Sequence, residues 1–215
     1  MVSGYRYVIT LNFYLRIASD YMVLLCTFLD SMEWTKPNTI GETPPNCRAH
    51  TATAYEKKLY IFGGGAGNEY YQSLYILDTV TRRWTHPRFS SSDPDDEIPV
   101  PKPRRAHSAV IYEGKLIIFG GGNGTNALND VWVMDLRVPL ERMAWQELET
   151  IGEKPGPRGY HTANIVNGIM VIVGGSDGKT SYHDIWCLHL GACCFIKLTS
   201  CAGTYVSVQL RGDGV

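Results

Sequence analysis

The 215-residue sequence has no excess of charge of either sign, since 20 lysines and arginines stand against 21 aspartates and glutamates. A chain so close to neutral lacks the basic surface that nucleic acid binding requires, so we expect no nucleic acid partner. The longest apolar stretches of the N-terminal region, residues 7–15 and 21–29, are well short of the ~20 residues that cross a bilayer. We therefore expect no membrane insertion.

The six cysteines include no C-x-x-C pair, the spacing typical of zinc and redox sites. Four of them lie between Cys187 and Cys201, with His183 and His189 close by in the sequence. We interpret them as reduced thiols in a cytoplasmic protein, with no bound metal. A zinc cluster and disulfides are the alternatives.

Familiar catalytic motifs are also missing. The sequence has no G-x-S-x-G elbow, no H-E-x-x-H and no complete G-x-x-x-x-G-K-[ST] phosphate loop. Residues 120–124 weakly resemble a dinucleotide fingerprint, but a strand-like run rather than a helix follows them. We therefore expect neither an enzyme nor a cofactor.

What the chain has in quantity is glycine and aromatic residues: 22 Gly, 13 Tyr and 5 Trp. Three glycine runs begin at equivalent places, each directly after four apolar residues and thirteen residues after a histidine. Another apolar segment follows each run ten to fourteen residues later. The repeated residues, to which we assign structural roles, are His50, His107, His161, Gly63, Gly64, Gly120, Gly121, Gly174, Gly175, Trp84 and Trp145.

The spacing of these runs is 57 residues and then 54 residues. A period of about 50 residues with four short apolar segments is typical of a four-stranded propeller blade. Tight-turn dipeptides at Glu113-Gly114 and Asn167-Gly168 separate the first two strands. The sequence therefore predicts an all-β fold with three clear blades and a partial one.

The glycine doublets, the Arg-Ala-His segments at 48–50 and 105–107, and the distal tryptophans resemble the kelch repeat. The resemblance covers about residues 31–198 and implies a kelch-type β-propeller. Three positions depart from the pattern: His189 where Asp78 and Asp135 stand, Phe195 where a third tryptophan would stand, and Gly159 where Arg48 and Arg105 stand.

We divide the chain into an unmatched lead-in at 1–20, the repeats at 21–198 and an unmatched tail at 199–215. The repeats comprise a partial blade at 21–46 and units at about 47–102, 103–156 and 157–198. Kelch rings typically have six or seven blades, so we expect an incomplete ring. Either the chain is a truncated product of a longer array, or further blades or self-association complete the ring.

Antiparallel strand order places the loops after the second strands and the connections between blades at the same end of the propeller. Long loops on a rigid scaffold are where binding usually occurs. We therefore expect a partner-binding face formed by Tyr70, Tyr71, Asn126, Lys179, Tyr182, Arg104 and Arg105. For the arginines, pairing inside the blade is the alternative. We expect each repeat histidine to hydrogen-bond locally on its own first strand.

Two functions follow from the resemblance. The first is a noncatalytic protein-interaction scaffold or adaptor that binds another protein. The second is a fragment of a copper radical oxidase similar to galactose oxidase, which would need a Tyr–Cys crosslink and converging Tyr and His ligands. Only Cys47 lies near the repeat interior, so we favour the first function.

Overall fold

Short β-strands joined by turns and loops make up the computed structural model. The structure describes residues 13–18, 21–27, 34–35, 37–89 and 98–198. The only helical element among these residues is a 3-10 turn, η1 (Leu140–Arg142). No helix in this described part is long and apolar enough to cross a membrane.

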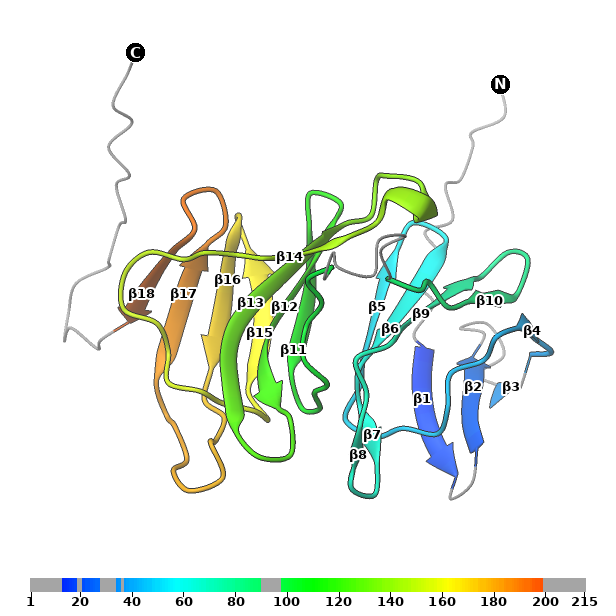
Figure 1. Ribbon diagram of the computed structural model, residues 1–215, viewed down its shortest axis with the longest axis horizontal. Helices are drawn as coiled ribbons and strands as arrows, with labels where there is room; N and C mark the ends of the chain where they lie inside the picture. The colour runs from blue at the N-terminus through cyan, green and yellow to red at the C-terminus, as the bar shows by residue number, and fades with distance from the viewer. Residues whose placement is uncertain (1–12, 19–20, 28–33, 36, 90–97, 199–215) are drawn as a thin grey trace, which may run out of the picture.

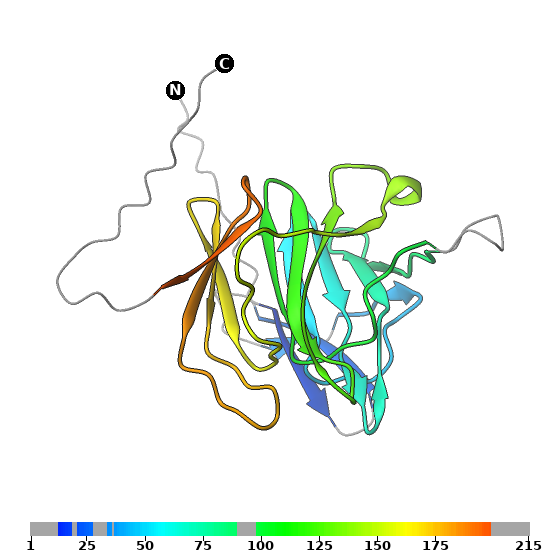
Figure 2. The same ribbon diagram turned by 60° about the vertical axis from the view of Figure 1, so that its left-hand side comes forward.

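The strands form successive antiparallel sheets that stand side by side as an open arc (Figures 1 and 2). Blade 1 contains β1 (Phe13–Ala18), β2 (Tyr21–Thr27) and β3 (Trp34–Thr35). Blade 2 contains β5 (Thr51–Tyr55), β6 (Lys58–Phe62), β9 (Leu74–Asp78) and β10 (Arg83–Thr85). Blade 3 contains β11 (Ser108–Tyr112), β12 (Lys115–Gly122), β13 (Ala127–Asp135) and β14 (Trp145–Glu147). Blade 4 contains β15 (Thr162–Val166), β16 (Ile169–Val173), β17 (Ile185–His189) and β18 (Cys194–Leu198).

In blades 2 to 4 each strand pairs with the next one of its blade, so the order in the sheet follows the sequence. The first strands of neighbouring blades contact one another, β5 with β11 and β11 with β15. The first strands therefore line the inner side of the arc and the fourth strands its outer side. The predicted all-β kelch-type architecture is confirmed, and the ring is not closed.

Strand β1 differs from our expectation, because its residues fall in the lead-in that we left outside the repeats. It pairs along its whole length with β2, from Phe13 opposite Cys26 to Ala18 opposite Tyr21. Residues 1–12 and the tail 199–215 lie outside the described residues.

The turns between first and second strands are as tight as the dipeptides predict. Glu113 and Gly114 have φ of 48° and 70°, and Asn167 and Gly168 have φ of 49° and 77°. Positive φ at both central residues is the hallmark of a type I′ turn, whose twist matches that of the flanking strands. These turns fix the register of the two hairpins.

A feature that the sequence did not reveal closes the outer edge of two blades. Strand β4 (Ile40–Gly41) precedes blade 2 but pairs in parallel with β10, the last strand of that blade. Ile151 does the same with Cys194 in blade 4. Both come from the repeated segment Thr-Ile-Gly-Glu, which thus covers the backbone groups of an edge strand that would otherwise be exposed.

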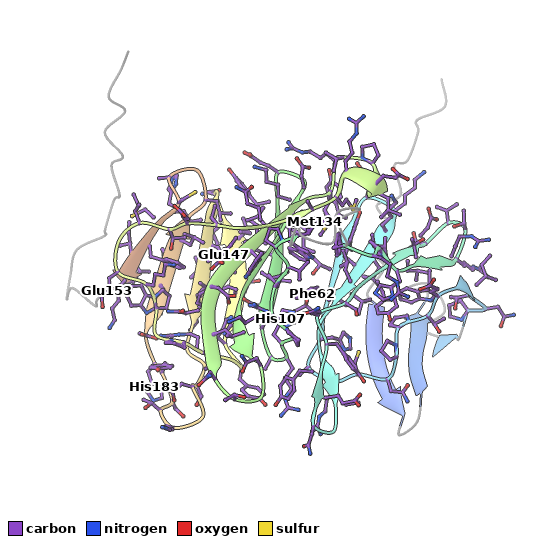
Figure 3. The ribbon with its side chains drawn as sticks, in the orientation of Figure 1. Phe62, His107, Met134, Glu147, Glu153 and His183 are labelled. Atoms are coloured by element: carbon purple, nitrogen blue, oxygen red, sulfur yellow. The ribbon has the colours of Figure 1, made fainter. Side chains whose placement is uncertain are left out.

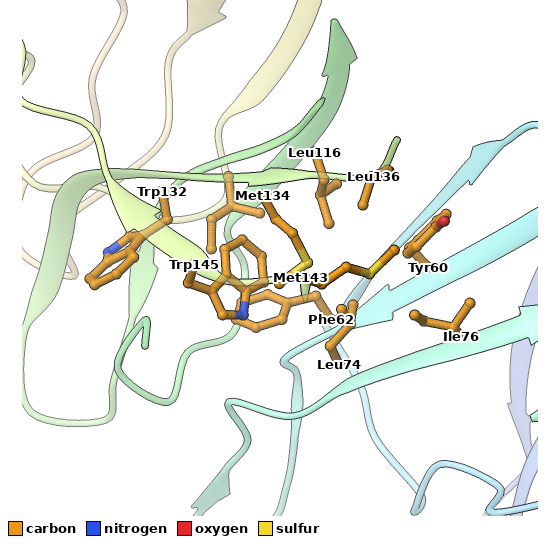
Figure 4. Close-up of a cluster of buried hydrophobic side chains, with 11 residues drawn as sticks. Tyr60, Phe62, Leu74, Ile76, Leu116, Trp132, Met134, Leu136, Met143 and Trp145 are labelled. Atoms are coloured by element: carbon orange, nitrogen blue, oxygen red, sulfur yellow. The ribbon is translucent and has the colours of Figure 1, made fainter. Parts of the chain in front are cut away.

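The hydrophobic core lies between blades rather than within one sheet. Between blades 2 and 3, Phe62 packs on Trp145 with ring centroids 4.9 Å apart, amid Leu74, Leu116 and Met134 (Figure 4). Between blades 3 and 4, Phe195 takes the place of the tryptophan. The buried residues there are Val110, Ile117, Phe119, Val131, Met170, Ile172, Trp186, Leu188 and Phe195. Each such side chain contributes about 1.5–3 kcal/mol on burial.

Candidate functional site

The long loops gather at one end of the arc, the lower edge in Figure 1, as antiparallel order predicts. We call this the loop end. It contains the segments that follow β6, β12 and β16, including the hairpin of β7 (Gly65–Ala66) and β8 (Glu69–Tyr70). It also contains the connections that lead into β11 and β15. The opposite end has the tight turns and the longer β13–β14 connection that contains η1.

A hollow of about 210 Å³ opens at the loop end. Residues of blades 2, 3 and 4 line it: Tyr70, Arg105, Ala106, Gly121, Gly122, Gly124, Thr125, Asn126, Ala127, Gly159, Tyr160, Ser176, Asp177 and Gly178. Three predicted residues, Tyr70, Arg105 and Asn126, thus lie around a common hollow. Pockets for small ligands usually measure about 300–1,000 Å³, so this hollow suits a side chain or turn of a protein partner better.

Tyr70 and Arg105 form one flat surface across two blades. The Arg105 guanidinium lies over the Tyr70 ring, 4.4 Å from its centroid, and donates a hydrogen bond to the carbonyl of Gly67 at 3.4 Å. The ring also lies against Gly124 of blade 3, where an added Cβ would be 2.8 Å from the ring. Stacking holds a positive charge in place at the rim while leaving it half exposed.

Tyr160 is a residue that our sequence analysis missed. Tyr160 is 74% exposed. Its φ of 58° is close to the φ of 55° for Ala49 and 56° for Ala106 at the equivalent positions of blades 2 and 3. The Tyr160 amide donates to the carbonyl of Ala106, and the Ala106 amide donates to that of Ala49. The aligned repeats did carry a signal for this residue. Tyr160 directly precedes its repeat histidine, whereas alanines precede the other two, at Ala49 and Ala106.

Three other predicted residues lie at the loop end but outside the hollow. The Tyr71 hydroxyl donates to Glu69 at 3.5 Å, and Lys179 is exposed. Tyr182 covers the Arg158 guanidinium at 4.1 Å and donates its hydroxyl to Asp177 at 3.0 Å. Tyr182 therefore supports the loop as well as forming part of its surface.

The expectation that Arg104 faces a partner is wrong, because its side chain is fully buried. It forms two hydrogen bonds with the Asp130 carboxylate, at 2.8 and 2.7 Å, and donates to the carbonyls of Lys102 and Gly120. Adjacent residues of an extended chain point in opposite directions, so Arg105 is directed outward while Arg104 is directed inward. The alternative of pairing inside the blade holds for Arg104.

The same pair recurs in blade 4, where Arg158 binds Asp184. Its hydrogen bonds, together with that from Trp186, hold the pKa of Asp184 at about 2 against the effect of burial. In blade 2 the equivalent positions are Cys47 and Ser73, so this blade lacks the pair. The sequence carried a signal for both pairs, because arginine and aspartate are 26 residues apart in each.

Two of the repeat histidines, His107 and His161, bond across blades and not only locally as we expected, whereas His50 Nδ1 lies 3.3 Å from Sγ of Cys47, three residues before it. His107 Nε2 is 2.9 Å from Thr51 Oγ1 of blade 2, and His161 Nε2 is 2.8 Å from Ser108 Oγ of blade 3. Each histidine therefore joins its blade to the preceding one. Figure 3 shows His107 beside Phe62 of blade 2, with ring centroids 5.4 Å apart. Burial, and then the charge of Arg104, lower the pKa of His107 to about 3.

Within the described residues, no three His, Cys, Asp or Glu side chains gather as a metal ion would require. Cys47, Cys187, Cys193 and Cys194 form no disulfide there. Burial raises the pKa of the Cys47 thiol to about 11, which keeps it protonated.

His189 replaces the acidic residue of the other blades and performs the same task. Asp78 Oδ1 accepts the amides of Val80 and Thr81, and Asp135 Oδ1 accepts the amide of Arg137. His189 Nδ1 accepts the amide of Ala192 at 3.0 Å. Any acceptor at this position ties the turn between the third and fourth strands, so the departure from the repeat pattern preserves the turn.

Open sheets arranged around a common inner side, with a loop end on one edge, define the protein as a repeat β-propeller. A family model described as the KLHDC2/KLHL20/DRC7 Kelch-repeats domain matches residues 17–208. The chain therefore belongs to the Kelch-repeat family.

Several curated proteins are similar over most of this chain. The dynein alpha chain of the flagellar outer arm of Chlamydomonas reinhardtii is 32% identical over 75% of the chain and 4% of its own length. Host cell factor 2 of Homo sapiens is 36% identical over 69% of the chain and 21% of its own length. Acyl-CoA-binding domain-containing protein 4 of Arabidopsis thaliana is 29% identical over 69% of the chain and 22% of its own length. The matched part thus covers less than a quarter of each relative.

Proposed function

We propose that this chain is a noncatalytic protein-interaction scaffold or adaptor in the cytoplasm, and that another protein binds at its loop end. Kelch-repeat membership supports an interaction module in general. The observation that carries the particular proposal is the hollow at the loop end, to which three blades contribute residues.

The residues around this hollow are suited to protein recognition. Tyr70 and Tyr160 offer large, rigid aromatic surfaces, and Arg105 offers a charge fixed by stacking. Tyrosine and arginine are enriched among residues that dominate binding energy at interfaces. The strands that carry these loops have fully buried side chains, which hold the strands in place. The loop surface is therefore preorganised and loses little entropy on binding.

The test is affinity purification with the intact chain as bait, comparing the natural protein with Tyr70→Ala/Tyr71→Ala. We expect partner recovery to fall by about tenfold or more, because each aromatic truncation at such a site costs about 1–2 kcal/mol. Val80→Ala is the matched control, since Val80 is 67% exposed in a turn at the opposite end. Unchanged recovery with the double variant, or a large loss of thermal stability without loss of binding, contradicts the proposal.

Metal analysis of the purified chain tests the oxidase alternative separately. We expect substoichiometric copper. One bound copper per chain would overturn the noncatalytic assignment.

A further inference from the structure

The last strand of blade 3 lacks the extra segment that covers the last strands of blades 2 and 4. In blade 2, Ile40 N donates to Arg82 O at 3.0 Å. In blade 4, Ile151 N donates to Cys193 O at 2.9 Å, and Phe195 N donates to Ile151 O at 3.1 Å. In the described part of the chain, β14 pairs with β13 on one side and with no strand on the other. An unpaired edge strand is a template on which another extended segment can add.

The backbone of β14 directs hydrogen-bonding groups out of the sheet at this edge. Leu148 N donates to Val131 O at 2.8 Å, so these two residues form a hydrogen-bonded pair. Such pairs alternate along an antiparallel ladder, which makes Trp145 and Met134 a non-hydrogen-bonded pair. The amide and carbonyl of Trp145 are therefore directed away from β13, like the amide of Phe195 in blade 4.

The segment that precedes blade 3 has the wrong residues to cover this edge. Counted back from the repeat histidines, Gly41 and Gly152 of the covering segments correspond to Ile98. The two glycines have φ of +93° and +85°, where isoleucine is strongly disfavoured. A Cβ on Gly41 would collide with Trp84 O, and one on Gly152 would lie 3.0 Å from a backbone oxygen. The next residue, Pro99, has no amide to donate.

The charges beside the open edge are opposite to those beside the covered edge of blade 2. There, Glu42 of the covering segment lies 3.0 Å from Arg88 Nη2 and 3.5 Å from His86 Nδ1. These two residues follow the fourth-strand tryptophan by four and two positions, where blade 3 has Glu149 and Glu147 (Figure 3). Both glutamates are exposed, and neither forms an ion pair with another described residue. A segment that covers β14 would therefore need a basic residue where the covering segment of blade 2 has glutamate.

A cavity of about 450 Å³ lies beside the start of β14, between the segment that follows β10 and the turn that contains η1. Its apolar lining includes Phe89, Ile98, Leu140, Met143 and Ala144. Ala144 directly precedes the fourth-strand tryptophan, as Arg83 does in blade 2, where it pairs with Ile40. The covering isoleucines of blades 2 and 4 are 53% and 63% exposed. At blade 3 the cavity would instead enclose the equivalent side chain.

We propose that the outer edge of β14 binds an extended segment of another protein, which adds as a parallel fifth strand of blade 3. This segment has the form Thr-Ile-Gly-Lys: an apolar residue in the cavity, a glycine against Trp145 O and a basic residue facing Glu147 and Glu149. The carbonyl of its apolar residue would accept from Trp145 N. The two covered edges define the backbone that fits, and the reversed charges define the basic residue. The surface lies on the outer side of the arc, so this inference goes beyond the loop-end function.

A second copy of this chain is a poorer occupant. Its two Thr-Ile-Gly segments, at 39–41 and 150–152, already pair in blades 2 and 4. Each is followed by a glutamate, Glu42 or Glu153, which would face the glutamates of blade 3. Like charges placed across an interface oppose binding.

The probe is an end-blocked peptide, Ser-Ser-Thr-Ile-Gly-Lys-Ser-Ser, added to the full chain while amide hydrogen exchange is followed by NMR. The reference is the Gln146 amide, which is directed toward β13. In the free chain we expect the Trp145 amide to exchange at least ~100-fold faster than that of Gln146. With the peptide at ten times its dissociation constant, exchange at Trp145 should slow by about tenfold. A peptide with alanine in place of glycine should not bind.

Charge reversal tests the specificity without altering any buried residue. A peptide with glutamate in place of lysine should bind about fivefold or more weakly to the natural chain. Glu147→Lys/Glu149→Lys should reverse this preference. Tyr70→Ala/Tyr71→Ala should leave peptide binding unchanged, which separates this surface from the loop end.

Three results would overturn the proposal. The first is no saturable binding of the lysine peptide, or equal binding of the alanine peptide. The second is a free chain in which the Trp145 amide is already as protected as that of Gln146, because the chain itself or a second copy then covers the edge. The third is binding that the loop-end variant abolishes and the charge reversal does not alter, which would place the peptide at the loop end.

Discussion

Asp130→Asn should be among the most destabilising single changes in this protein, although it alters only a few atoms. The substitution removes the charge that faces the fully buried Arg104 guanidinium, and it replaces one of two accepting oxygens by a donor. Breaking a buried pair by neutralising one partner typically costs about 3–5 kcal/mol, because the remaining charge is left uncompensated. The total stability of a domain is only about 5–15 kcal/mol.

The measurement is urea unfolding followed by far-UV circular dichroism, with the free energy taken from the midpoint and slope. Arg104→Met/Asp130→Asn is the matched control: it removes both charges, keeps most of the arginine's volume and leaves an oxygen for the Trp132 indole, which now donates to Asp130. We expect the double variant to recover at least half of the loss. Blade 2 already folds with Cys47 and Ser73 at these positions, so the charges are not required for a blade to form. A loss below about 1 kcal/mol for Asp130→Asn, or no recovery in the double variant, would refute the reasoning.

Three further outcomes are expected from the same unfolding assay. Gly121→Ala should cost about 2 kcal/mol or more, because φ is +97° and the new Cβ would lie 2.8 Å from a backbone oxygen; Gly122→Ala, whose nearest contact is 3.7 Å, is the control and should cost far less. The unfolded chain protonates His107 and His161 near pH 6.5, whereas burial lowers their pKa values in the folded chain to about 3 and about 4. The free energy of unfolding should therefore be highest above about pH 6.5 and decrease on acidification by about 1.4 kcal/mol per histidine and pH unit. A free energy of unfolding that stays constant from pH 7.5 to 5 would contradict this. Thr51→Val should cost about 1–3 kcal/mol by leaving His107 Nε2 unpaired, and a loss equal to that of an exposed Thr→Val change would argue against the cross-blade bond.

The strands were predictable because two local signals coincide at each of them. Continuous apolar runs such as 116–119 can only be buried on both faces, and dipeptides such as Glu113-Gly114 set where they reverse. The same pattern occurs in three repeat units, so each weak local signal is supported by the other two.

The contacts between blades were not predictable from spacing alone. Whether Arg104 or Arg105 points inward depends on how the connecting segment enters its blade, which the pattern of apolar residues does not record. The partner of His107 depends on the rotation of one sheet against the next, set by packing of side chains such as Phe62 and Trp145. The loop-end residues Tyr70 and Asn126 could be placed together because antiparallel order alone decides at which end a loop lies.

The pairing of Ile40 with Arg83, and of Ile151 with Cys194, has a consequence for folding during synthesis. Each backbone pairing joins the segment just before a blade to the last strand of that blade. The chain between the two paired residues has the same length in both cases. Such a pairing cannot form until the fourth strand has left the ribosome, and closing the loop then costs only a few kcal/mol of chain entropy. Blade 2 can therefore be completed while blade 4 is still being translated.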